Sequence, residues 1–123
     1  MTFKLTGLIS LLLFSLTPSK SPAQPYAKAT FAGGCFWWLA APFYKAEGVI
    51  SAISGYTGGE KENPSYKQVS SGRTKHIESV EITFNPKKIS YQQLLDIYWR
   101  QFDPTDSGGS FYDRGHQYTS AIF

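Results

Sequence analysis

The stretch Gly33-Gly34-Cys35-Phe36-Trp37-Trp38 carries the strongest structural signal of this chain. It holds the only cysteine among 123 residues, and the apolar run Leu39-Ala40-Ala41 follows it. Glycine permits a tight turn and a close ligand approach, and the apolar run predicts a helix that begins at or just after Cys35. The sulfur then lies beside the unpaired N–H groups of the helix N-terminus, where a thiolate is favoured. We interpret Cys35 as a candidate nucleophile beside an aromatic pocket; an inert buried thiol is the alternative.

The N-terminal segment has the order of a secretory signal peptide. Lys4 precedes an apolar run from Gly7 to Leu16, and the small-residue stretch Ser21-Pro22-Ala23 follows. The run is too short to span a membrane, and a buried N-terminal helix is the other interpretation. We expect residues 1–23 to be a cleaved signal peptide, residues 24–123 to form one domain, and the protein to be secreted or periplasmic.

Charge and cysteine content narrow the functional classes. The chain has 12 basic and 9 acidic residues, and removal of Lys4 and Lys20 leaves a net charge of +1. Without a Lys/Arg cluster, an electrostatic nucleic-acid binder is excluded. A single cysteine in an exported chain indicates a free reactive thiol or an intermolecular bond.

The rest of the sequence predicts alternating short strands and helices. The capping-box pattern Ser90-Tyr91-Gln92-Gln93 predicts a helix that runs to about Phe102, and Pro42 is unfavourable inside the helix expected after Cys35. Strands are expected at 28–32, 49–57, 77–84 and 118–123, with helices at 36–46, 66–69 and 91–102.

The strand expected at 77–84 places a carboxylate on its apolar face. Val80, Ile82 and Phe84 share one parity, and Glu78 has the same parity. Desolvation there raises the pKa of a carboxyl group and keeps it protonated, so Glu78 is a candidate acid. A partly solvated residue at the strand end is the alternative.

Three further polar residues lie in loop-rich stretches: Tyr66, Asp113 and Tyr118. Phenolic hydroxyls are suited to hold an oxygen that gains charge, although surface or packing roles are the alternative for each tyrosine. His76 and His116 leave a Cys–His hydrolase dyad open, since its partners need only meet in space. One cysteine and two distant histidines without metal-ligand spacing predict no metal site.

Six blocks then carry a family resemblance: GGCFWW, GYTGG, NPSYKQVSSG, KHIESVEITFNP, ISYQQLLDIYWRQFDPTD and DRGHQYTSAIF. In this order they resemble the A-type peptide methionine sulfoxide reductases over residues 28–123. The resemblance implies a thiol-dependent oxidoreductase without a cofactor, which reduces the S epimer of methionine sulfoxide, free or in proteins, and repairs oxidised proteins. It also implies an α+β two-layer sandwich, with helices packed on a mixed sheet of ferredoxin-like character.

The resemblance also implies roles for individual residues. Cys35 resembles the nucleophile and Glu78 the proton donor. The polar members of the family pocket correspond to Tyr66, Asp113 and Tyr118, and the aromatic wall for the substrate methyl group corresponds to Phe36 and Trp37. The implied product is a Cys35 sulfenic acid. Many family members carry a resolving cysteine of their own; here thioredoxin, a thioredoxin-like domain or a small thiol is expected instead.

The sequence departs from the family pattern at three positions near the pocket. Trp38 stands where the family usually has Gly or Cys, Ala40 where it has Glu, and Lys75 where it has Gly. Family chains also continue well beyond the last strand expected here, so we expect a C-terminally shortened member. The alternatives to an active reductase are the Cys–His hydrolase and an inactive remnant that binds methionine-like ligands.

Overall fold

The computed structural model describes residues 25–123. The predicted signal peptide lies outside the described residues, and within them no helix has the length and apolar character needed to cross a bilayer.

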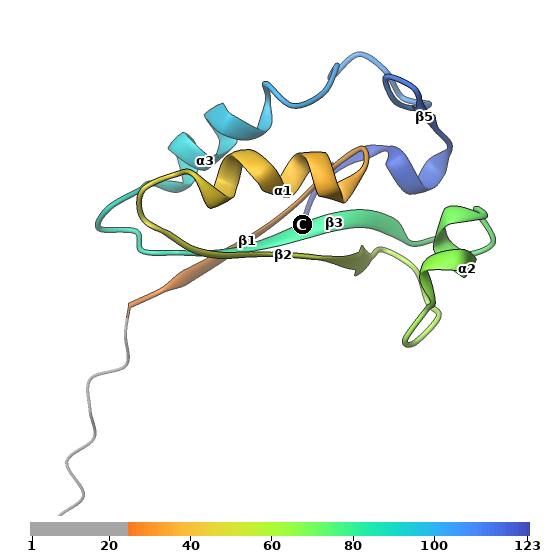
Figure 1. The fold of residues 1–123 in the computed structure, drawn as a ribbon, viewed down its shortest axis with the longest axis horizontal. Helices are drawn as coiled ribbons and strands as arrows, with labels where there is room; N and C mark the ends of the chain where they lie inside the picture. Colours follow the sequence, from red (N-terminus) through yellow and green to blue (C-terminus); the bar gives the residue numbers. More distant parts are fainter. Residues whose placement is uncertain (1–24) are drawn as a thin grey trace, which may run out of the picture.

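Four strands form one sheet in the order β2-β3-β1-β6 (Figure 1). They are β1 (Ala27–Gly33), β2 (Val49–Thr57), β3 (Ile77–Phe84) and β6 (Ser120–Ile122). β1 and β2 run in the same direction but are separated by β3, to which each is antiparallel. Within residues 25–123 the expected mixed sheet therefore contains antiparallel ladders only.

Helices α1 (Phe36–Tyr44) and α3 (Tyr91–Tyr98) connect β1 to β2 and β3 to β6, and both lie on the same side of the sheet (Figure 1). This βαββαβ order is the ferredoxin-like arrangement, so the two-layer α+β expectation is confirmed. Shorter elements complete the chain: α2 (Tyr66–Ser70), the hairpin strands β4 (Gly109–Ser110) and β5 (Asp113–Arg114), and the 3₁₀ turn η1 (His116–Tyr118).

The strands expected at 49–57 and 77–84 are confirmed to the residue, but both long helices are shorter than expected. α1 continues through Pro42 and ends at Tyr44, where Lys45 and Ala46 donate to carbonyls three residues earlier and so tighten the last turn. α3 begins after the predicted capping box and ends at Tyr98. Its last turn tightens, since Arg100 and Gln101 donate to carbonyls three residues earlier. The last strand begins at Ser120, because η1 occupies 116–118.

The core lies between the sheet and the two helices. Phe31 of β1 stacks on Tyr98 of α3, with ring centroids 4.8 Å apart, and its ring is 5.9 Å from that of Phe43 in α1. All three side chains are essentially inaccessible. Burying each such side chain contributes roughly 1.5–3 kcal/mol, so this contact fastens both helices to β1 and positions the N-terminus of α1.

Candidate active site

Cys35 occupies the N-cap of α1, so the predicted helix start is confirmed. Gly34 turns the chain from β1 into the helix with a φ of +102°, a conformation that favours glycine. A Cβ at Gly34 would lie 2.6 Å from the Cβ of Ser110, so only glycine permits the hairpin to approach this turn. The carbonyl of Cys35 accepts the N–H groups of Trp38 and Leu39. The Cys35 thiol is partly exposed and makes no capping hydrogen bond to the first turn of the helix.

Glu78 is the buried carboxyl group beside this turn. Its side chain is 1% exposed, and its Oε2 accepts the Phe36 N–H at 3.1 Å. Burial raises the pKa of Glu78, the Phe36 N–H opposes that shift, and the charge of Asp113 adds to it. The predicted burial of Glu78 is confirmed. One carboxyl oxygen is held at the first residue of α1, and the other is left to carry a proton.

The polar candidates from distant segments gather around Tyr118 in η1. Burial raises the pKa of this phenol, and the charges of Glu78, Tyr66, Asp113 and Cys35 raise it further. These five residues come from α2, β3, β5, η1 and, for Cys35, the N-cap of α1. The fold therefore brings the predicted nucleophile, acid and phenols into one electrostatic neighbourhood.

The two predicted aromatic wall residues have different environments. Phe36 is 6% exposed, and its ring lies 5.7 Å from Tyr56 and 6.5 Å from Tyr66, measured between centroids. Trp37 is 75% exposed on the same helical turn. Phe36 therefore packs within the cluster of phenols, whereas Trp37 faces solvent and does not line the cavity beside Cys35.

Tyr56 is a member of the site that sequence analysis missed. It lies directly opposite Glu78 in the β2–β3 ladder, and burial followed by the charge of Glu78 raises the pKa of its phenol. The register shifts by one residue between Val49 and Ser51. Without that irregularity the same pairing would place Tyr56 opposite Ile77, so strand pattern alone could not have found it.

Both histidines are bonded to the backbone away from Cys35. His76 is buried; its Nδ1 accepts the Gly59 N–H at 3.2 Å and its Nε2 donates to the Lys61 carbonyl at 2.7 Å. His116 Nε2 contacts the carbonyl of Lys75 at 3.1 Å. These bonds do not favour a Cys–His dyad. Among residues 25–123, no three His, Cys, Asp or Glu side chains are grouped so that they could hold a metal ion.

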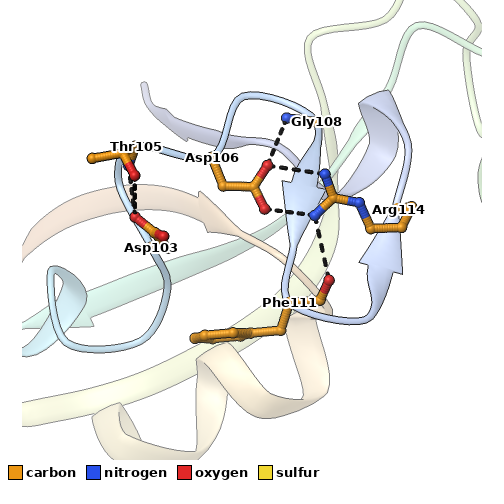
Figure 2. Close-up of polar contacts among 6 residues, drawn as sticks. All are labelled: Asp103, Thr105, Asp106, Gly108, Phe111 and Arg114. Atoms are coloured by element: carbon orange, nitrogen blue, oxygen red, sulfur yellow. Dashed lines mark hydrogen bonds and ion pairs between the residues drawn. The ribbon is translucent and has the colours of Figure 1, made fainter.

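An ion pair positions the hairpin that carries Asp113. The guanidinium of Arg114 makes two bonds to the Asp106 carboxylate, at 2.5 and 3.0 Å, and Arg114 Nη1 also donates to the Phe111 carbonyl (Figure 2). Asp106 in turn accepts the Gly108 N–H. The bond to Arg114 is the largest cause that lowers the pKa of Asp106, to about 2. The pair therefore persists through neutral and moderately acidic solution.

Comparisons of the sequence with a family pattern and with known proteins agree on one protein family. The pattern of the family described as peptide methionine sulfoxide reductase matches residues 27–123. One similar relative is the peptide methionine sulfoxide reductase MsrA of Bacillus licheniformis, which is 56% identical over 82% of this chain and 56% of its own length. Another is the peptide methionine sulfoxide reductase MsrA/MsrB of Vibrio cholerae, which is 51% identical over 94% of this chain and 32% of its own length. This chain thus spans between a third and a little over half the length of those relatives.

The structural matches agree with the sequence matches. Methionine sulfoxide reductase A of Corynebacterium diphtheriae superposes with a TM-score of 0.78 at 31% identity, over 85% of this chain and 48% of that one. Mxr1 of Saccharomyces cerevisiae in its reduced form gives a TM-score of 0.72 at 34% identity, over 84% of this chain and 61% of that one. Both comparisons support the α+β architecture described above.

Proposed function

The chain belongs to the peptide methionine sulfoxide reductase family, and on that premise we propose that it reduces the S epimer of methionine sulfoxide, free or in proteins. The Cys35 thiolate attacks the sulfoxide sulfur. Glu78 donates its proton to the sulfoxide oxygen, and Tyr66 and Tyr118 stabilise the charge that this oxygen gains. Oxygen passes to Cys35, so the substrate sulfur gains two electrons and the cysteine becomes a sulfenic acid.

The observation that carries this proposal is the buried Glu78, bonded to the residue that follows Cys35. A raised pKa keeps a proton on this carboxyl group at higher pH than for an exposed glutamate. The Phe36 N–H occupies Oε2, and we assign the transferred proton to the other carboxyl oxygen. Phe36, which packs beside Tyr66, supplies apolar surface for the substrate methyl group; the same role for Trp37 stays a prediction, since its side chain faces solvent.

The catalytic cycle needs a thiol to return Cys35 to its reduced state. We propose that another protein of the thioredoxin type, or a small dithiol, supplies this thiol; Cys35 is the single cysteine in these 123 residues. One thiol condenses with the sulfenic acid and releases water, and a second thiol breaks the mixed disulfide. The predicted signal peptide supports repair of exported, oxidised proteins as the biological role.

The decisive experiment exposes the protein to methionine S-sulfoxide without thiol and then adds dimedone, which labels sulfenic acids. We expect a label on Cys35 and one methionine formed per protein molecule. With dithiothreitol the reaction should turn over, and Cys35→Ser should abolish it. The R epimer is the matched control and should remain unchanged.

Each alternative gives a different result in the same assay. A Cys–His hydrolase would be acylated at Cys35 by an activated ester and would not depend on dithiothreitol. An inactive remnant would bind methionine-like ligands and never acquire the dimedone label. Persistence of sulfoxide reduction in Cys35→Ser would show that Cys35 is not the nucleophile.

A further inference from the structure

A cavity of about 500 Å³ opens beside Cys35. Its lining includes Cys35 and Asp113, so the cavity meets the five-residue cluster at these two residues; Glu78, Tyr66 and Tyr118 do not line it. Cavities of about 300–1,000 Å³ hold drug-sized ligands. The cavity therefore has room for more than a single methionine sulfoxide side chain.

Three aromatic residues contribute to the walls of the cavity. They are Trp38 of α1 and, at the tip of the β4–β5 hairpin, Phe111 and Tyr112. Their side chains are 78%, 65% and 100% exposed, while Leu39, which also lines the cavity, is buried. Asp113 is the only charged residue in the lining, so the walls fit a large uncharged apolar group.

Phe111 is held in a conformation that aromatic residues rarely adopt. Its φ is +50°, a region in which a bulky side chain is strained and glycine or asparagine is usual at a hairpin tip. The Arg114 guanidinium, fixed by Asp106, donates to the Phe111 carbonyl at 3.3 Å and holds the turn (Figure 2). Strain of this kind occurs where a side chain serves a function, and here it places an exposed ring at the cavity wall.

We propose that this cavity binds the large apolar side chain of a residue adjacent to methionine sulfoxide in a polypeptide. The inference rests on the proposed function, because Cys35 fixes where the sulfoxide sulfur must lie, within about 3–3.5 Å of the thiolate. A neighbouring side chain then enters the cavity between Trp38 and Phe111. Gln101 and Ser110 supply uncharged polar groups along the lining for the peptide backbone.

The test measures kcat/KM with dithiothreitol for blocked dipeptides that contain methionine S-sulfoxide and either phenylalanine or alanine, in both orders. In at least one order we expect the phenylalanine peptide to be favoured about tenfold, because its ring is partly buried on binding. Trp38→Ala and Phe111→Ala should each reduce this ratio to about two. Tyr26→Ala, an exposed aromatic residue before β1 and outside the cavity lining, is the control and should keep the wild-type ratio.

The ratio is taken within one preparation, so a loss of folded protein cancels. A wild-type ratio near one in both orders, or an unchanged ratio in both cavity variants, overturns the proposal. If the wild-type protein is a dimer that Trp38→Ala dissociates, and the ratio is unchanged, a second copy of the chain occupies the cavity. That result also overturns the proposal.

Calorimetry with the unoxidised dipeptides on Cys35→Ser protein separates this inference from the proposed function. Tighter binding of the phenylalanine dipeptide, lost in Cys35→Ser/Trp38→Ala, supports the cavity assignment even if no sulfoxide is reduced. Equal binding of the two dipeptides contradicts it.

Discussion

At the scale of single residues, Glu78 shows a conflict between stability and function. A carboxyl group that is 1% exposed and bonded to one backbone N–H resists ionisation. Its raised pKa means that it stabilises the fold below the ordinary glutamate pKa and loses that contribution as pH rises through the shifted value. The proposed chemistry uses this property, because only the protonated form donates to the sulfoxide oxygen.

We therefore predict opposite effects of Glu78→Gln on rate and stability. The amide oxygen still accepts the Phe36 N–H, but the amide cannot transfer a proton as a general acid, so the single-turnover rate of Cys35 oxidation should fall by about 10²–10⁴-fold. The wild-type rate should decline as pH rises through the pKa of Glu78, and the variant should lack that decline.

In thermal unfolding, Glu78→Gln should be more stable than wild type at pH 8, with the difference shrinking as the solution is acidified. Glu81→Gln is the matched control, since Glu81 lies on the same strand, partly exposed and paired with Lys28. A wild-type pH profile for the variant would remove Glu78 from the role of proton donor.

At the scale of elements, the ends of the helices decide where the site residues stand. Ser65 and Ser90 each accept the N–H of the third helical residue, and the Gln68 and Gln93 side chains bond back to the cap. These capping boxes begin α2 at Tyr66 and α3 at Tyr91. α1 has no such cap; Cys35 stands at its N-terminus, and the first N–H is used by Glu78.

For α3 we predict that Ser90→Ala lowers the free energy of unfolding by about 1 kcal/mol, because the Gln93 N–H loses its partner. Urea denaturation would measure this change. Ser107→Ala, an exposed loop serine, is the control and should change stability by less than about 0.5 kcal/mol. Equal stabilities of the two variants would show that the cap contributes little.

At the scale of the whole molecule, Tyr98 connects helix α3 to strands β1 and β6 of the sheet. Its buried phenol donates to the carbonyl of Ala32 in β1 at 2.7 Å and contacts that of Ala121 in β6 at 3.2 Å. Burial raises the pKa of Tyr98 to about 12, against the opposing bond to Ala121. One side chain of α3 thereby holds β6, which follows directly after the turn that carries Tyr118.

We predict that Tyr98→Phe lowers the free energy of unfolding by about 1–3 kcal/mol, since buried carbonyls lose a donor. Hydrogen exchange of the Phe123 amide, which bonds to Thr30 in the described structure, should accelerate. Tyr91→Phe is the control, because Tyr91 is 42% exposed at the start of the same helix. Unchanged exchange at Phe123 in Tyr98→Phe would contradict the proposed link between α3 and β6.

Local sequence patterns determined a large part of this protein. The glycine pair before Cys35 predicted the strand-to-helix turn, the parity of 77–84 predicted the burial of Glu78, and the Ser90 capping box predicted the start of α3. Each of these depends on residues within a few positions of one another, where backbone sterics and side-chain period act directly.

Long-range contacts decided the rest. Tyr56 stands opposite Glu78 because of an irregularity in the β2–β3 ladder, and the cavity beside Cys35 exists because the Phe111 hairpin folds back onto Gly34 and Trp38. These positions depend on the register and packing of segments tens of residues apart. No local propensity encodes such packing, and only the folded chain brings the segments together.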